Sequence, residues 1–164
     1  MGVFPTECPS HKTASKTEQE RRNYMFSQTV EYALRAIVHL AKEPDLLQTT
    51  AQISLATQVP APYLSKILQT LTREGLVSVR RGVRGGFLLG KSPKQMTIYE
   101  VVQCVDPIRR IRTCPLELAS HGKRLCSLHK KMDNALESIE SVFRKTTLAE
   151  LMNSPNPSVP LCDV

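Results

Sequence analysis

Three residues in the second half of the chain have side chains that can bind a metal or carry out thiol chemistry. Cys114 and Cys126 are separated by 11 residues, and His129 follows Cys126 by three positions. Residues three apart share a helical face, so Cys126 and His129 can point at one metal. Thiolate and imidazole ligands suit zinc or an iron–sulfur cluster. The pattern predicts a metal site formed by a loop cysteine and the start of a helix.

Other interpretations of these residues stay open. Cys114 and Cys126 could form a thiol switch without a cluster, or the loop could be purely structural. In a thiol hydrolase, Cys126 would be the nucleophile and His129 its base. However, a pair three residues apart on one helix leaves no obvious orienting acid or oxyanion hole, and the chain contains no glycine-rich phosphate loop. We therefore expect a protein that is not an enzyme.

The remaining cysteines and the hydropathy indicate the compartment. Cys104 lies on an apolar helix and is expected to be a small buried side chain, whereas Cys8 and Cys162 fall in the terminal tails. Five scattered cysteines do not form a disulfide framework of the secreted kind. No apolar run approaches the roughly 20 residues of a membrane span, and no secretory signal is present. These features predict a cytoplasmic protein with no membrane partner.

The excess of basic residues is concentrated in one segment. The 164-residue chain has 22 Lys and Arg against 15 Asp and Glu, a net charge of +7. Five of the basic residues lie between Gly75 and Tyr99, where there is no acidic residue. Trp is absent and aromatic residues make up only 5%, which argues against base-stacking platforms for RNA or single strands. Double-stranded DNA is therefore the predicted partner.

Apolar spacing predicts the elements that carry these residues. Helical periodicity is found over 27–42, 50–58 and 63–74, followed by two β-like runs over 76–80 and 86–89 around a glycine-rich turn. A further helix is expected over 97–105, then an irregular basic loop over 106–124. The last long helix, over 125–145, has a spacing close to that of a coiled-coil seam.

This order of elements predicts a mainly α fold, a winged helix-turn-helix with a two-stranded wing and a long C-terminal dimerisation helix. We divide the chain into a disordered extension (1–24), a DNA-binding domain (25–95), a cysteine loop with dimerisation helix (96–152) and a disordered tail (153–164).

The third helix is expected to enter the major groove while the wing follows the backbone. Candidate DNA contacts are the outward positions at the start of that helix and the wing arginines: Pro62, Tyr63, Ser65, Lys66, Gln69, Arg80, Arg81 and Arg84. Two alternatives remain, namely that the basic hairpin is only a solvated surface and that Tyr63 belongs half to the core.

The run V-P-A-P-Y-L-S-K-I-L-Q-T-L-T-R-E-G-L-V, followed by R-R-G-V-R-G-G-F-L-L-G, resembles the IscR/NsrR/BadM-type (Rrf-family) bacterial transcription regulators. The resemblance covers about residues 25–152 and includes the I-Y-E-V-V segment, the cysteine loop and the long helix. It implies a homodimer that binds a pseudo-palindromic operator in DNA and often senses iron–sulfur status, nitric oxide or redox change.

The resemblance also implies a ligand set for an iron–sulfur cluster, with a 2Fe–2S form favoured over 4Fe–4S. Cys114, Cys126 and His129 match three of the four family positions, but the middle cysteine is replaced by Ser120. The neighbouring His121 could substitute for it. Glu31 is similar in position to the acidic residue that some members donate across the dimer, and could complete the shell. A clusterless DNA-binding regulator, acting as a thiol switch or a protein-recruiting scaffold, is the alternative.

Overall fold

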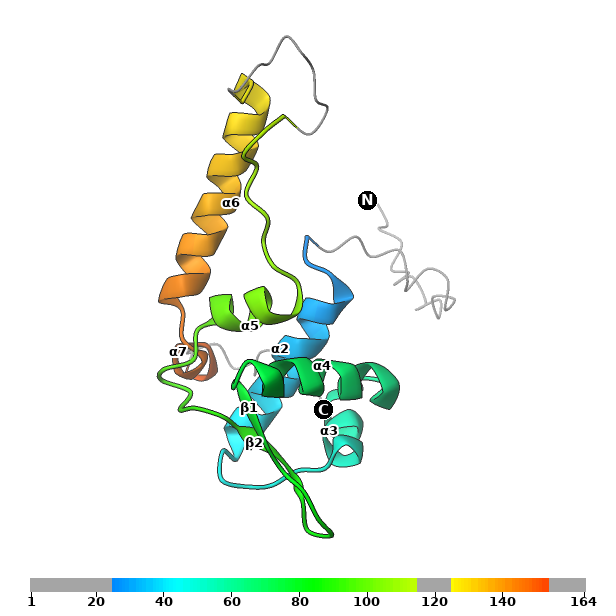
Figure 1. Ribbon diagram of the computed structural model, residues 1–164. Helices are drawn as coiled ribbons and strands as arrows, with labels where there is room; N and C mark the ends of the chain where they lie inside the picture. The colour runs from blue at the N-terminus through cyan, green and yellow to red at the C-terminus, as the bar shows by residue number, and fades with distance from the viewer. Residues whose placement is uncertain (1–24, 115–124, 154–164) are drawn as a thin grey trace, which may run out of the picture.

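The computed structural model describes residues 25–114 and 125–153, and within them it forms a helical body with a small antiparallel sheet (Figure 1). In chain order the elements are α2 (Gln28–Lys42), α3 (Thr50–Thr57), α4 (Ala61–Arg73), β1 (Val77–Arg80), β2 (Gly86–Leu89), α5 (Ile98–Val105), α6 (Ser127–Lys145) and α7 (Leu148–Met152). This is the predicted mainly α winged helix-turn-helix with a long C-terminal helix.

Local sequence signals set the helix boundaries. Ser27 caps α2, and capping boxes begin α3 at Thr49 and α5 at Thr97. Helix α4 starts directly after Pro60 and ends before Gly75, which adopts the left-handed conformation at φ +73°. These boundaries lie within a few residues of the predicted ones because caps, prolines and glycines act locally.

The wing is the predicted hairpin, β1 paired with β2. The register pairs Val77 with Leu89 and Arg80 with Gly86. At its base, a Cβ added to Gly90 would lie 2.1 Å from the carbonyl oxygen of Gly75, so only glycine permits this approach. The hairpin extends away from the body at the end opposite to the tip of α6 (Figure 1).

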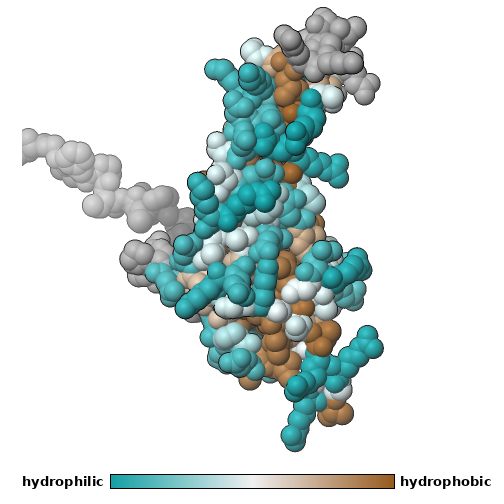
Figure 2. Space-filling model, turned by 60° about the vertical axis from the view of Figure 1, so that its left-hand side comes forward, coloured by the Kyte–Doolittle hydropathy of each residue, from teal (hydrophilic) through white to brown (hydrophobic). Residues whose placement is uncertain are grey.

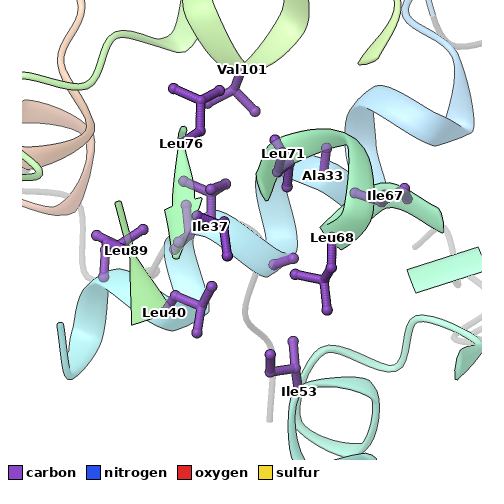
Figure 3. Close-up of a cluster of buried hydrophobic side chains, with 14 of the residues drawn as sticks. Ala33, Ile37, Leu40, Ile53, Ile67, Leu68, Leu71, Leu76, Leu89 and Val101 are labelled. Atoms are coloured by element: carbon purple, nitrogen blue, oxygen red, sulfur yellow. The ribbon is translucent and has the colours of Figure 1, made fainter. Parts of the chain in front are cut away.

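One hydrophobic core joins the winged helix to the elements that follow it. Figure 3 shows Ile37 and Leu40 of α2, Leu68 of α4 and Val101 of α5 packed together. Leu148 of α7 is fully buried in the same cluster. The segments before and after residue 95 therefore share a core, and a displacement of α5 would also displace α2, on which it packs.

Helix α6 projects from this body, and no residue along its length is buried. Its base is fixed because the guanidinium of Arg144 lies 3.5 Å from the centre of the Tyr99 ring. Farther along, Leu128, Met132 and Val142 are 63%, 48% and 59% exposed. Figure 2 shows hydrophobic patches between hydrophilic ones along this column. The apolar seam expected from the sequence is thus present without a partner in the single chain.

Two details differ from the predictions. Helix α7 is absent from the predicted elements, although Thr147 and Glu150 form a capping box that signals it. Helix α6 begins at Ser127 rather than at residue 125, with Cys126 in the N-cap position. The predicted disordered segment 1–24 and nearly all of the predicted tail lie outside the described residues.

Candidate nucleic-acid interface and cysteine site

The outward face of α4 contains most of the predicted DNA contacts. Pro62, Tyr63, Lys66 and Gln69 are exposed, while Ser65 is half-buried. Leu64, Leu68 and Leu71 hold the opposite face in the core. The start of α4 therefore presents polar and aromatic side chains on a helix that the core holds rigidly, as a major-groove helix requires.

The turn between α3 and α4 is fixed by hydrogen bonds. Gln58 adopts the left-handed conformation at φ 55°, and Val59 beneath it is buried. The hydroxyl of Ser54 donates to the Val59 carbonyl at 2.6 Å. A guanidinium nitrogen of Arg35 on α2 lies 3.5 Å from the Thr57 carbonyl oxygen. These contacts set the angle at which α4 leaves α3.

The wing arginines are accessible. Arg80, Arg81 and Arg84 are exposed, and in the part of the chain that the structure describes none of them forms an ion pair. Val83 at the tip between them is fully exposed. Long hydrophilic side chains project from this end of the molecule (Figure 2). Guanidinium groups without carboxylate partners can bind phosphates.

The structure brings two of the predicted metal ligands together. Cys126 Sγ lies 3.3 Å from His129 Nδ1, at the N-terminal end of α6. One thiol and one imidazole on the same helical face form a donor pair that suits zinc or an iron–sulfur cluster. Cys114 is 8% exposed and lies at the end of the segment that leads from α5.

A complete ligand set is not assembled in the described ranges. There, no group of three His, Cys, Asp or Glu side chains is placed to hold a metal ion. Ser120 and His121 fall in residues 115–124, outside the described residues. The donor chemistry of Cys126 and His129 thus fits the implied cofactor, while the remaining ligands stay a prediction.

Glu31, the predicted ligand from the first helix, is engaged within its own chain. Its Oε1 accepts from Arg35 Nη2 at 2.5 Å, one helical turn along α2. Because Arg35 also reaches the Thr57 carbonyl, Glu31 is linked to the turn before α4. The i, i+4 spacing of Glu31 and Arg35 was a signal for this ion pair in the sequence.

The segment between α5 and α6 is clamped to α6 by Arg110. Its guanidinium donates two hydrogen bonds to Asp133, at 2.7 and 2.8 Å, and the Ile111 amide donates to the same carboxylate at 2.9 Å. Glu137 and Glu140 lie 3.4 and 3.6 Å from the guanidinium. The hydrogen bond from Arg110 holds the pKa of Asp133 below its usual value and raises the pKa of Arg110.

The clamp occupies one basic side chain of the predicted loop over 106–124. The Arg110 guanidinium is bound to carboxylates of α6 and is not directed at a cysteine. The contact fixes residues 106–114 alongside the helix that carries Cys126 and His129 (Figure 1).

Cys104 is separate from this site. It packs against the main core cluster on α5 but is only half-buried, less than the predicted full burial. Burial and the nearby charge of Glu74 raise the pKa of its thiol. A thiol of raised pKa is a weak nucleophile at neutral pH.

Comparisons with known proteins agree with this geometry. The family model Rrf2, described as an iron-dependent transcriptional regulator, matches residues 26–154. A putative HTH-type transcriptional regulator of Aquifex aeolicus (strain VF5) is 31% identical over 132 residues, covering 79% of this chain and 92% of that protein.

Two solved structures share the fold. CymR, the global cysteine regulator of B. subtilis, is similar with a TM-score of 0.64 and 22% identity, over 78% of this chain and 95% of that one. IscR of T. potens is similar with a TM-score of 0.65 and 20% identity, over 79% and 86%. No described helix is long and apolar enough to cross a lipid bilayer. The family match, the relative and the winged helix together show that the chain belongs to the Rrf2 family of DNA-binding transcription regulators, which are not enzymes.

Proposed function

We propose that this regulator binds a pseudo-palindromic operator as a homodimer, and that an iron–sulfur cluster held by Cys114, Cys126 and His129 sets its affinity for DNA. Regulators of the Rrf2 family bind DNA and are dimeric. What is proposed for this chain is the set of contacting residues, the cofactor and the coupling between them.

The DNA contacts are assigned to α4 and the wing. Helix α4 enters the major groove by its N-terminal half, with Lys66 and Gln69 facing the bases or the adjacent phosphates. Arg81 and Arg84 of the wing loop contact the flanking backbone. The accessibility of all these side chains supports the assignment.

The dimer is assigned to α6. A helix of 19 residues with no buried side chain and several exposed large apolar ones would expose an apolar seam to water if the chain stayed monomeric. Pairing two such seams about a two-fold axis gives the dimer the symmetry of a palindromic operator.

The observation that carries the sensing proposal is the contact between Cys126 and His129. The sulfur of Cys126 and the imidazole of His129, both soft donors, already lie 3.3 Å apart at the N-terminal end of α6. A bound cluster would supply sensitivity to redox change or nitric oxide, and the 2Fe–2S form is proposed because mixed Cys and His ligation occurs in 2Fe–2S centres of the Rieske type. The partner subunit's Glu31 is proposed as a further ligand, which requires it to leave Arg35.

The coupling runs through the elements that the clamp joins. Arg110 ties the loop segment to α6, and that segment continues into α5. Helix α5 packs on α2, which lies at the centre of the core and contacts α4. If α5 packs on α2 in two arrangements, α4 takes a different position in each. A coupling free energy of about 1–3 kcal/mol between the cluster and the DNA-binding surface changes operator affinity about 5- to 150-fold.

A thiol switch through Cys114 and Cys126 is the second candidate function. It is favoured by the serine at position 120, which leaves two thiols in the loop region where related regulators have three. In this mechanism, without a cluster, hydrogen peroxide would oxidise the two thiols to a disulfide and be reduced to two molecules of water, and the new S–S bond would move the same segment.

Anaerobic purification separates the two candidates. The cluster proposal predicts coloured protein with iron and sulfide in equal amounts, and loss of the colour in Cys126→Ala but not in the matched control Cys104→Ala. Colourless, metal-free protein that still binds DNA, selected from a random duplex library, would contradict the cluster and favour the thiol switch. Absence of binding to any duplex would contradict the DNA assignment itself.

A further inference from the structure

We infer that His39 and Gln48 are positioning residues for the wing: they tie the end of α2 to β2 and thereby set the angle at which the wing arginines meet DNA. This inference rests on the proposed contact of the wing with DNA. Neither residue is among the proposed DNA contacts or the proposed cluster ligands.

Gln48 extends the wing sheet by one residue. Its amide donates to the Phe87 carbonyl at 2.9 Å, and the Phe87 amide donates back to the Gln48 carbonyl at 2.8 Å. This reciprocal pair forms an antiparallel bridge, so β2 is held by β1 on one edge and by Gln48 on the other. The wing is therefore anchored to the segment that joins α2 to α3, rather than attached only at its two ends.

The residue next to the bridge is fitted to it. A Cβ added to Gly86 would lie 2.9 Å from both the nitrogen and the oxygen of Gln48. Only glycine lets the two backbones approach so closely without a shift. Gly86 pairs with Arg80 in the hairpin. A displacement of Gln48 would therefore also displace β1, the strand that leads into the loop with Arg81 and Arg84.

The side chain of Gln48 is held by α2. It is 7% exposed, and its Oε1 lies 2.6 Å from His39 Nε2 in the last turn of α2. An amide oxygen only accepts hydrogen bonds, so the His39 Nε2–H donates. Leu40 and Ala41 beside His39 are buried in the main core, which makes this donor a fixed point.

The geometry thus gives a short connection from the central helix to the wing: His39 to Gln48 by side chains, then Gln48 to Phe87 by backbone. Without the His39 donor, the buried amide of Gln48 has to find another partner and move away from α2. The bridge to Phe87 would move with it, and the loop carrying Arg81 and Arg84 would tilt relative to α4.

A double-mutant cycle tests the inference. His39→Leu removes the donor at similar bulk, and His39→Gln restores an N–H donor on a side chain of related reach. Each is measured in the natural chain and in an Arg81→Ala/Arg84→Ala background, with one fluorescent duplex selected from a random library. In the natural chain we expect His39→Leu to weaken binding by about 5-fold, within the range of about 2- to 150-fold that coupled residues show.

In the background without Arg81 and Arg84, the same substitution should change affinity less than about 2-fold, because the tilted loop then has neither of these contacts to lose. His39→Gln should bind nearly as well as the natural chain. Equal losses in both backgrounds would overturn the inference, since His39 would then act through stability or α4. If Arg81→Ala/Arg84→Ala itself left affinity unchanged, the wing contact would be wrong, which is a distinct failure.

Amide hydrogen exchange keeps the test decisive if His39→Leu is too unstable for binding assays. We expect faster exchange at the Phe87 amide with no change at the Leu68 amide in the core of α4. Equal acceleration at both amides would mean global destabilisation and would overturn the positioning role.

Discussion

The assignment of the wing to the DNA backbone has a quantitative consequence in salt. Arg81 and Arg84 are exposed, lie on one loop and form no ion pair with the residues that the structure describes. A dimer carries two such loops, so the double variant Arg81→Ala/Arg84→Ala removes four cationic side chains. If each neutralises one phosphate, its loss reduces the slope of log affinity against log salt by about 0.9.

The expected size of the effect follows directly. Four contacts contribute about 3.6 to the slope, so between about 50 and 200 mM salt they account for an affinity change of about 150-fold. The double variant should bind more weakly at low salt and lose much less affinity as salt is added. The loss should also be similar for specific and unrelated duplexes, because phosphate contacts do not read sequence.

Fluorescence anisotropy titrations at several salt concentrations measure this slope. The matched control is Lys130→Ala/Lys131→Ala, which removes the same charge from exposed positions on α6, far from the wing (Figure 1). The control should change the slope by less than about one unit. An unchanged slope in the wing variant, or an equal change in the control, would refute the assignment of these arginines to phosphate contact.

Three further predictions concern stability and assembly. Gly90→Ala should lower the free energy of unfolding in urea by more than Gly75→Ala does. A Cβ at position 90 would lie 2.1 Å from the Gly75 carbonyl oxygen, whereas a Cβ at position 75 has no neighbour within 4 Å. Gly75→Ala therefore costs only the strain of its left-handed backbone, about 1–2 kcal/mol. The opposite order would contradict the described hairpin base. The hydrogen bond from Arg110 holds the pKa of Asp133 below its ordinary value of 3.8, so the stabilisation is complete well above that pH and is lost as pH falls through the lowered pKa. Asp133→Asn should therefore differ from the natural chain in urea titrations at neutral pH and converge with it in acid. Val142→Glu, at a position 59% exposed on α6, should yield monomers by light scattering and weaken operator binding; a persistent dimer would place the interface elsewhere.

Much of the fold could be predicted because its signals are local. Ser27 and Thr97 cap their helices, Gly75 ends α4, and the glycines of the hairpin mark its turns. Helix α7 carries an equally local signal in its capping box, but five residues give too little periodicity to identify a helix.

The contacts that organise the site are of another kind. Arg110 and Asp133 are 23 residues apart and belong to no motif, so only the packing of the loop segment on α6 brings them together. The same holds for His39 and Gln48, whose contact depends on how α2 meets the wing. The contact between Cys126 and His129 was predictable because three residues along one helix is a local distance.

The claim that the cysteine site sets DNA affinity is tested most directly by one comparison. Operator affinity is measured anaerobically for the natural protein as isolated and after treatment with an iron chelator, and again for Cys126→Ala treated in the same way. A change of about 5- to 150-fold in the natural protein, with less than about 2-fold in Cys126→Ala, is the result that coupling predicts. Equal affinity in the two states, or the same response in Cys126→Ala, would contradict it.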